Sequence, residues 1–307
     1  MDRLESMSTL IAAVEAGSLS GASRKLRMPL ATVSRKVSEL EAHLRTKLIN
    51  RTSRSLTLTD AGEAYVAACK KILEEIGEAE RAAMGEYSEP RGDLTVSAPI
   101  FFGRLHVLPV AIEFLTAYPE IDLRMVLTDR VINLLDEPVD VAIRIADLAD
   151  SSLVAARVGS IRRVVCGSPA YFAGRGTPKT PEDLAAHDCI SFEGLASAKT
   201  WSFHAGRFET TIRVHSRLIV NTAEAAIDAA IAGLGVTRVL SYQIADALKA
   251  GTLITALEKF EPMPASVSLV YSGHGLLTQK LRAFLDFARP WLRARLSELD
   301  ANRAKFE

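Results

Sequence analysis

The sequence has 307 residues, of which 48% are hydrophobic and 24% are charged, a composition that predicts an ordinary globular protein with two or three domains. Its three cysteines lie far apart and form no Cys-x-x-Cys motif and no Cys/His pair at zinc spacing, which fits a reducing compartment. Charged residues near the N-terminus exclude a signal-peptide core and no apolar run approaches about 18 residues, so we expect a cytoplasmic protein without a membrane segment.

The charges are unevenly distributed along the chain. The 37 basic side chains balance 37 acidic ones, so the net charge is zero. Residues 1–60 nevertheless carry ten basic and six acidic side chains, whereas residues 61–89 carry three basic and seven acidic ones. A basic end on a neutral chain predicts a polyanion-binding module joined to a part with another role.

The N-terminal region is predicted to contain three helices. Residues 2–16 follow a helical pattern, after which Gly17 ends the helix and Ser18 offers an N-cap for the next one, SLSGASRKL. A short break at residues 27–29 precedes the third helix, which lies within MPLATVSRKVSELEAHL.

The third helix has two different faces. Its apolar stripe repeats at helical spacing and consists of Val33, Val37, Leu40 and Leu44. The other side is small, hydroxylated and basic, and contains Ala31, Arg35, Ser38 and Ala42, with Thr32, Ser34 and Lys36 on the flanks. This thin face is either solvated or enters a groove in a partner.

The residues after Leu48 predict a hairpin. β-Branched residues and alternation in LINRTSRSLTLT indicate two short strands with Arg51 and Arg54 at the tip. The order of helix, helix, tight turn, helix and hairpin is that of a winged helix-turn-helix.

A long helix is predicted from Thr59, whose hydroxyl suits an N-cap, with Asp60 and Glu63 in the first turn, where carboxylates favour the helix dipole. An apolar seam with heptad-like spacing follows and consists of Tyr65, Cys69, Ile72, Ile76, Ala79 and Ala83. We interpret it as a coiled-coil dimerisation seam, and the alternative is an amphipathic helix that packs only on its own domain. The helix is expected to end near a hinge-like linker at 89–92.

Beyond the linker, predicted strands alternate with helices. The strands are expected at LTVSA, IDLRMVLT, VDVAIRI, RRVVCGS, CISFEG and GVTRVL. The helices are expected at GRLHVLPVAIEFLTAY, EDLAA, AEAAIDAAIAG and SYQIADALKAG. This alternation predicts an α/β fold with largely parallel sheets, arranged as one domain or two lobes.

The sequence offers no catalytic or metal-binding constellation. Its six histidines are scattered, without a His-x-x-x-His pair, an acidic cluster at ligand spacing or a Gly-x-Ser-x-Gly motif. The Gly-x-Gly in AGLGV follows a predicted helix and precedes a strand, the reverse of the dinucleotide-binding order, so we interpret it as a helix stop. We therefore expect no enzymatic activity, no metal and no cofactor.

These residues resemble the LysR-type transcriptional regulators. The N-terminal match runs through LIAAVEAGSLSGAS, ATVSRKVSELEAHL and LINRTSRSLTLTDAG. The C-terminal match runs through RGDLTVSAP, VDVAIRI, GSPAYF, TPEDLAAHDCISF, AAIAGLGV and KAGTLITAL. The resemblance covers nearly the whole chain, and its N-terminal signature is long and specific.

The resemblance implies a domain order. A winged helix-turn-helix DNA-binding domain is expected at 1–59, a dimerisation helix at 60–89 and an effector-binding domain at 90–307. The effector-binding domain is expected to be a two-lobed α/β unit similar to periplasmic solute-binding proteins. Its first lobe is expected at about 92–163 and 266–297, and its second at about 164–265.

The resemblance also implies a function. The chain is expected to be a sequence-specific regulator that binds double-stranded DNA under the control of a small-molecule effector held between the lobes. Homodimers through the long helix and homotetramers through the effector domains are implied, with RNA polymerase as a further candidate partner. The alternatives are a solute-binding protein and an enzyme for a small acid that share the two-lobed fold.

The expected DNA contacts lie in the first turns of the recognition helix and on the wing, at Leu30, Ala31, Thr32, Ser34, Arg35, Lys36, Arg51 and Arg54. Small side chains on the helix allow it to lie deep in the major groove. The alternative for the basic residues is that Arg35 or Lys36 is only solvated and that Arg51 pairs with Glu41 or Asp60.

Three residues depart from the family pattern, and one of them is Ile49, which replaces a common aromatic residue or leucine. Leu30 stands where many relatives carry a polar reader, so it can contact a thymine methyl but cannot donate a hydrogen bond to a base. Arg45 stands where a glycine is usual, and it is expected to need a left-handed or distorted turn.

The candidate effector contacts follow from their positions at strand ends and helix starts. They are Ser97, Pro99, Phe101, Phe102, Thr128, Arg144, Ser168, Asn221 and Thr222. Two adjacent phenylalanines suggest an apolar or aromatic ligand portion. Arg144 projects from the side of its strand opposite Val141 and Ile143, where it either binds an anionic ligand or forms a structural salt bridge.

Overall fold

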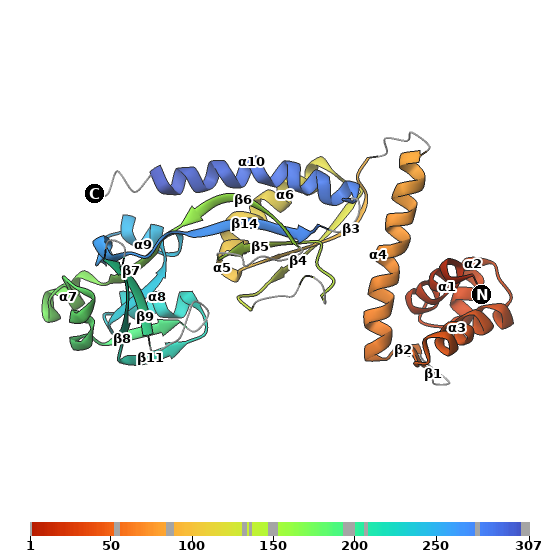
Figure 1. Ribbon diagram of the computed structural model, residues 1–307, viewed down its shortest axis with the longest axis horizontal. Helices are drawn as coiled ribbons and strands as arrows, with labels where there is room; N and C mark the ends of the chain where they lie inside the picture. The colour runs from red at the N-terminus through yellow and green to blue at the C-terminus, as the bar shows by residue number, and fades with distance from the viewer. Residues whose placement is uncertain are drawn as a thin grey trace. The chain divides into compact units, whose positions relative to one another are not determined.

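The computed structural model (Figure 1) describes residues 2–51, 56–83, 89–130, 134, 137–146, 153–192, 200–205, 208–273 and 277–301. The chain forms two compact units, each with its own core. The first consists of Met1–Glu89 with Leu276–Gln279, and the second of Pro90–Gly275 with Lys280–Glu307.

The first unit has the predicted order of elements. These are α1 (Arg3–Glu15), α2 (Leu19–Leu26), α3 (Leu30–Leu44), β1 (Ile49–Arg51), β2 (Leu56–Leu58) and α4 (Asp60–Ala83). The N-cap predicted at Ser18 is confirmed, because its Oγ accepts the Gly21 N–H at 3.0 Å. The N-cap predicted at Thr59 is also confirmed, because its Oγ1 accepts the Gly62 N–H at 3.0 Å. Each cap satisfies a backbone donor that the first helical turn leaves unpaired.

The apolar stripe of α3 faces the core of the first unit, as its spacing predicts. Val33, Val37 and Leu40 are fully buried, and Leu44 is half-buried. The core that α3 shares with α1, β1 and α4 contains Leu10, Val37, Leu40, Leu48, Ile49 and Val66. Burial of this stripe orients α3 so that its opposite face is left at the surface.

The start of α4 approaches the hairpin closely at Gly62. A Cβ atom at this position would lie 1.9 Å from the carbonyl oxygen of Leu48, which a side chain cannot do. The glycine therefore lets the first turn of α4 rest directly on the backbone that leads into β1.

A buried carboxylate joins α3 to the hairpin. Glu41 is 4% exposed, and its Oε1 accepts the N–H groups of Leu48 at 2.9 Å and Ile49 at 3.3 Å. The ammonium of Lys47 lies 3.2 Å from Oε2. Burial alone would raise the pKa of Glu41, but the two backbone donors and Lys47 outweigh it, so the pKa lies below its ordinary value.

The first lobe of the second unit is built on a five-stranded sheet in the order β4-β3-β5-β14-β6. Its strands are β3 (Gly92–Ala98), β4 (Ile121–Leu127), β5 (Val141–Ile145), β6 (Leu153–Ile161) and β14 (Ala265–Ser272). β4, β3 and β5 are parallel, whereas β14 is antiparallel to both of its neighbours. We call this sheet and its helices lobe I.

The helices of lobe I are α5 (Ile100–Phe102), a π-helical turn η1 (Gly103–Val107), α6 (Leu108–Ala117) and α10 (Gln279–Ala301). Phe114 of α6 meets Phe284 of α10 edge to face, with ring centroids 5.2 Å apart. The run Ile100–Ala117 is long and apolar enough to cross a membrane, but Val110 and Phe114 within it are fully buried. It is therefore a core segment of lobe I.

The second lobe, lobe II, is built on the sheet β11-β8-β12-β7-β13 with a separate β9-β10 hairpin. Its strands are β7 (Arg163–Gly167), β8 (Cys189–Phe192), β9 (Thr200–Ala205), β10 (Phe208–Arg213), β11 (Ser216–Val220), β12 (Val236–Leu240) and β13 (Ile254–Ala256). Its helical segments are α7 (Pro169–Arg175), η2 (Pro181–Ala186), α8 (Ala223–Ile231), η3 (Ser241–Ile244), α9 (Ala245–Lys249) and η4 (Glu258–Phe260).

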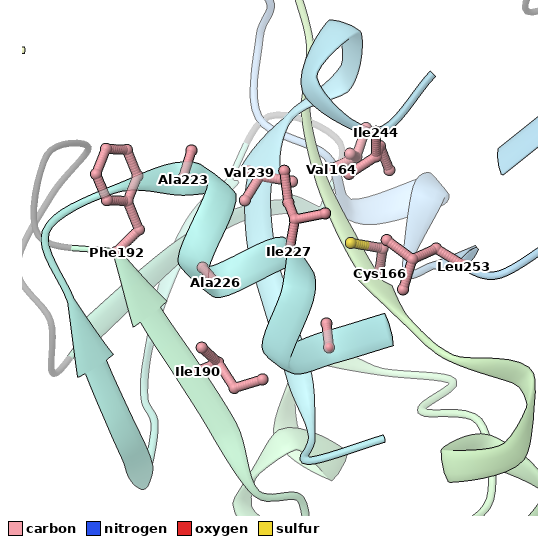
Figure 2. Close-up of a cluster of buried hydrophobic side chains, with 11 residues drawn as sticks. Val164, Cys166, Ile190, Phe192, Ala223, Ala226, Ile227, Val239, Ile244 and Leu253 are labelled. Atoms are coloured by element: carbon pink, nitrogen blue, oxygen red, sulfur yellow. The ribbon is translucent and has the colours of Figure 1, made fainter. Parts of the chain in front are cut away.

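Two separate apolar clusters cover the two faces of the lobe II sheet. Figure 2 shows the first, in which Ala226 and Ile227 of α8 pack on Val164 and Val239 of the sheet. In the second cluster Trp201 and Phe203 of the β9-β10 hairpin cover Val165. Gly233, with φ +81°, follows α8 and confirms the predicted helix stop in AGLGV.

The prediction of largely parallel sheets is wrong for part of each lobe. β8, β11 and β12 are parallel, but β7 and β13 are antiparallel to the strands that they pair with. The chain changes direction because it passes from lobe I to lobe II after β6 and returns before β14. This mixed topology changes which strand ends share an edge.

The two passages between the lobes are tied together by an ion pair. Arg162 lies between β6 and β7, and Glu261 lies between η4 and β14. The guanidinium Nη1 of Arg162 lies 3.1 and 2.9 Å from the two carboxylate oxygens of Glu261. Both side chains are largely buried, so this pair is protected from solvent screening.

We expect Glu41→Ala to destabilise the first unit by about 1–3 kcal/mol, because two buried backbone donors lose their acceptor. Chemical unfolding of both proteins at pH 7 measures the difference. Glu39→Ala on the same helix removes only an exposed pair and should cost less than about 0.5 kcal/mol.

The pH dependence follows from the lowered pKa of Glu41. The stabilisation that its carboxylate provides is complete above the ordinary pKa of 4.5 and is lost as the pH falls through the lower folded value. The difference between wild type and Glu41→Ala should therefore shrink below about pH 4.5. A difference that stayed constant from pH 7 to pH 3 would contradict this role.

Candidate functional site

The surface left by the buried stripe of α3 is thin and exposed, as the sequence predicts. Leu30 is 47% exposed, Ala31 and Arg35 are exposed, and Thr32 and Ser34 are half-buried. α3 begins without a side-chain N-cap, since Pro29 occupies the cap position. The first turn therefore presents small side chains and backbone N–H groups at the surface.

Arg35 is held loosely on this surface. Its Nη1 lies 2.8 Å from the Oε1 of Glu39, one turn along α3. The Arg35 side chain is 63% exposed, and such exposed pairs contribute only about 0.3–0.5 kcal/mol. A polyanion can therefore replace Glu39 as the partner of this guanidinium.

Lys36 does not belong to the exposed surface. Its side chain is 13% exposed, and its Nζ lies 2.5 Å from the Oε2 of Glu5 on α1. The DNA contact expected of Lys36 stays a prediction, and its charge is paired with Glu5 within the first unit. Its sequence position on the flank of the helix did not reveal the partner on α1.

Arg45 ends α3 in a left-handed conformation, with φ +53°, which confirms the strained turn that the sequence predicts. The Arg45 N–H donates to the carbonyl of Ala42, and the Thr46 N–H donates to that of Glu41. A second left-handed residue, Arg27 with φ +52°, ends α2 and was not anticipated. Both turns place an exposed arginine beside α3.

The predicted hairpin is confirmed as the antiparallel pair β1 and β2, with Ile49 opposite Leu58 and Arg51 opposite Leu56. The backbone of Arg51 ends β1, whereas its side chain and residues 52–55, with Arg54, lie outside the described part of the structure. The Arg51 and Arg54 contacts thus stay predictions.

The apolar seam of α4 divides into two parts. Cys69 is fully buried and Tyr65 packs against the core of the first unit. Burial raises the pKa of Tyr65 to about 12, with a further contribution from Cys69. Ile72 is 41% exposed, Ile76 is half-buried and Ala79 is exposed, whereas the side chain of Ala83 is not described.

The amphipathic-helix alternative therefore holds for the first turns of α4. Tyr65 and Cys69 bind the helix to its own unit, and the remaining apolar surface lies further along, at Ile72, Ile76 and Ala79. This shorter surface is the part of the seam that a second chain can reach.

The structure brings several predicted effector residues together at the edge of lobe I. β3 and β4 are parallel, so Ser97 near the end of β3 and Thr128 just after β4 lie at the same edge of the sheet. The Thr128 N–H donates to the carbonyl oxygen of Ala98. Pro99 caps α5, and the carboxylate of Asp129 accepts the Ile100 N–H at 3.2 Å. Sequence reasoning missed Asp129, although it directly follows Thr128.

The two phenylalanines join the lobes instead of lining an open site. Phe102 has no exposed surface, and Phe101 packs against the α8 face of lobe II. Both rings meet Tyr242 of η3 edge to face, at 5.8 and 5.5 Å between centroids. The prediction that Phe102 contacts a ligand is therefore wrong, because Phe is used here as core.

Asn221 and Thr222 lie where the sequence predicts, between the end of β11 and the start of α8. Asn221 is exposed, and the Thr222 hydroxyl accepts the Ala225 N–H at 3.4 Å as the N-cap of α8. The ends of β8, β11 and β12 share this edge of lobe II because these strands are parallel.

Ser168 lies at the opposite edge of lobe II. β7 runs antiparallel to β12, so the residue after β7 comes to the far end of α8, beside Gly233. The buried Ser168 hydroxyl accepts the Tyr171 N–H at 3.3 Å and caps α7. The prediction that Ser168 shares a site with Asn221 and Thr222 is wrong, because it assumed a parallel strand.

Carboxylates dominate the electrostatics between lobe I and the start of α8. Burial raises the pKa of Asp129, the Ile100 N–H opposes this shift, and the carboxylate of Glu224 on α8 raises the pKa further. Burial and the same two carboxylates raise the pKa of Tyr242. Neither Glu224 nor Tyr242 was singled out from the sequence, because only the fold brings them to this edge.

Arg144 lies on β5 opposite Ser268 of β14. Burial lowers its pKa, whereas the carboxylate of Glu137 raises it. Both interpretations of Arg144, that it binds an anionic ligand or that it forms a structural ion pair, stay predictions. Among the residues that the structure describes, no group of three His, Cys, Asp or Glu side chains is placed to hold a metal ion.

Comparison with protein families gives two matches. Residues 4–63 match the bacterial regulatory helix-turn-helix protein of the lysR family, and residues 88–293 match the LysR substrate binding domain. The first match covers nearly all of α1 and the whole of α2, α3, β1 and β2, and the second covers β3 to β14, whereas most of α4 lies between the two matches.

Known proteins match along nearly the whole chain. An HTH-type transcriptional repressor of Pseudomonas aeruginosa is 33% identical over 94% of this chain and 91% of its own length. The HTH-type transcriptional regulator CrgA of Neisseria meningitidis serogroup B is 32% identical over 92% of this chain and 95% of its own length.

Solved structures show the same arrangement of elements. The structure of CrgA, a LysR-type transcriptional regulator, has a TM-score of 0.60 at 31% identity and covers 94% of this chain and 98% of that one. The full-length Vibrio cholerae virulence activator AphB has a TM-score of 0.57 at 26% identity and covers 93% and 98%. The chain therefore belongs to the LysR family of transcriptional regulators, with a helix-turn-helix DNA-binding unit followed by an effector-binding unit.

Proposed function

We propose that the first turns of α3 read operator DNA in the major groove, with Leu30, Ala31, Thr32, Ser34 and Arg35 as the contacts. The exposed thin face of α3 carries this proposal, because small side chains permit close approach. Arg35 supplies the positive charge and needs only to leave an exposed partner, Glu39. Arg51 and Arg54 of the wing extend the contact to the neighbouring groove.

We assign a separate role to each part of the chain. Residues 1–59 bind DNA, residues 60–89 carry the dimer contact and residues 90–307 bind the effector, within a cytoplasmic protein. Its relatives are named as transcriptional regulators and not as enzymes. Regulation of transcription also makes RNA polymerase a candidate partner.

The proposed dimer contact is the outer part of the α4 seam. Ile72, Ile76 and Ala79 are the seam residues left at the surface once Tyr65 and Cys69 have packed inward. A second copy of α4 covers them in a parallel or antiparallel pair, and effector units add further contacts in a tetramer. Pairing would place two copies of α3 for two DNA half-sites.

The proposed effector site lies between the end of β3 in lobe I and the start of α8 in lobe II. Ser97, Pro99 and Thr128 are the candidate contacts of lobe I, and Asn221 and Thr222 are those of lobe II. A ligand that contacts both lobes favours one lobe arrangement over others, and so changes how the paired DNA-binding units are spaced.

Arg35→Ala should weaken binding to the chain's own promoter region by about 1–3 kcal/mol if Arg35 reads a base, or reduce the salt slope by about one if it holds a phosphate. Fluorescence anisotropy across a salt series distinguishes the two. Glu39→Gln is the matched variant, and it should bind equally or more tightly because it releases Arg35. An unchanged footprint for Arg35→Ala would remove this residue from the interface.

Ile76→Asp should convert dimers to monomers, because a charge in the seam must be desolvated on pairing. Sedimentation velocity of the full chain measures the change. Glu74→Gln lies on the other side of α4 and should leave the dimer intact. Persistence of the dimer in Ile76→Asp would place the dimer contact elsewhere.

Asn221→Ala should weaken effector binding about fivefold or more, as expected for one lost hydrogen bond. A thermal-shift screen of small metabolites on the full chain supplies the ligand for titration. Ser168→Ala is the control and should leave effector affinity unchanged, since Ser168 lies at the other edge of lobe II. Equal losses in both variants would argue against the proposed site.

A further inference from the structure

Two arginines share one face of the lobe II sheet. In the β7-β12 ladder Arg163 lies opposite Leu240, and Arg238 lies opposite Val165. Arg163 and Arg238 are thus diagonal neighbours with side chains on the same face, at a spacing from which long side chains meet. This face is the one that Trp201 and Phe203 of the β9-β10 hairpin cover.

Arg238 is buried and Arg163 is half-buried, and both side chains have few partners. Arg238 is 6% exposed, and its Nη1 donates to the backbone carbonyl of Ser202 at 3.0 Å. Its guanidinium carbon lies 5.4 Å from the centre of the Trp201 ring. The Nε of Arg163 is buried and has no hydrogen-bond acceptor among the described residues. Within the same part of the chain, neither arginine forms an ion pair with a carboxylate.

Other arginines in and next to lobe II have carboxylate partners. Arg162 is paired with Glu261, and Arg175 and Arg217 both lie within 3.5 Å of Asp188. Burial lowers the pKa of Arg238 to about 9, and the nearby charge of Arg163 lowers it further in the same direction. Burying two like charges without a counter-charge costs several kcal/mol per ion, so a compensating anion is favoured.

The geometry points to a binding site for a small oxyanion, a carboxylate or a phosphate, held by Arg163 and Arg238 beneath the β9-β10 hairpin. Guanidinium groups bind such anions through paired N–H donors, and the unpartnered Nε of Arg163 is one of them. The ligand must be a small free anion, because a phosphate within a polymer cannot reach a side chain that is 6% exposed.

This site is separate from the proposed effector site. Its arginines lie on the face of the lobe II sheet opposite α8, whereas Asn221 and Thr222 lie at the start of α8. Arg163 directly follows Arg162, whose ion pair ties the two passages between the lobes. An anion here therefore binds beside the connection between the lobes, and the inference does not depend on which residues contact DNA or effector.

The test is calorimetric titration of the dialysed full chain with phosphate, sulfate or succinate at constant ionic strength, balanced with sodium chloride. We expect saturable binding of at least one of these anions, with Kd at least tenfold weaker in Arg163→Gln and in Arg238→Met. Arg175→Gln, which changes a paired arginine of the same lobe, should bind as the wild type does. Binding of phosphate and sulfate alone identifies a tetrahedral oxyanion, and binding of succinate alone identifies a carboxylate.

Stability in chloride provides a second readout. Arg238→Met removes an uncompensated buried charge, so its Tm without added oxyanion should equal or exceed that of the wild type, and it should lose the increase that the oxyanion causes. If Arg238→Met does not fold, the partly exposed Arg163→Gln carries the same comparison. Equal anion effects in all variants, or no saturable binding by the wild type, would overturn the site.

Discussion

The surface that we propose to read DNA depends on one buried carboxylate, that of Glu41. Glu41 sits on the inner side of the recognition helix and accepts two backbone N–H groups from the start of the wing. The helix and the wing are otherwise joined mainly by non-directional apolar packing. Because hydrogen bonds to a charged acceptor are strong and directional, Glu41 fixes the angle between α3 and the start of the hairpin.

In the effector-binding unit, the two lobes are likewise joined by both apolar packing and a charged interaction. Phe101 and Phe102 of lobe I pack against Tyr242 of lobe II, and this aromatic contact is compatible with small changes of angle. The ion pair of Arg162 and Glu261 instead ties the two passages of the chain at one place. The lobes thus have a charged connection at the passages and an apolar contact beside it, an arrangement suited to a response that changes lobe geometry.

The basic side chains of this protein differ in exposure and in whether a carboxylate pairs with them. The arginine on the recognition helix is exposed and weakly paired, so it can exchange an internal carboxylate for a phosphate or a base. Lys36, one residue further, is neutralised internally by Glu5. In lobe II, Arg238 is buried and Arg163 is half-buried with a buried Nε, and neither has a carboxylate partner among the described residues. Burial makes an unpaired charge costly, which is why the second arrangement calls for a small anion and the first for a polyanion.

The sequence by itself determined the features that repeat locally. Helical spacing identified the buried stripe of α3, and short polar residues identified the caps at Ser18 and Thr59. The left-handed turn at Arg45 was expected from the resemblance, because related sequences usually have a glycine at this position. Only the tertiary structure decided which side chains meet. Lys36 forms an ion pair with Glu5 of another helix, and Cys69 is buried in its own unit. Because β7 is antiparallel to β12, Ser168 and Thr222 lie at opposite edges of the lobe II sheet. Such pairings join residues far apart in the chain, and local periodicity holds no information about strand direction or distant partners.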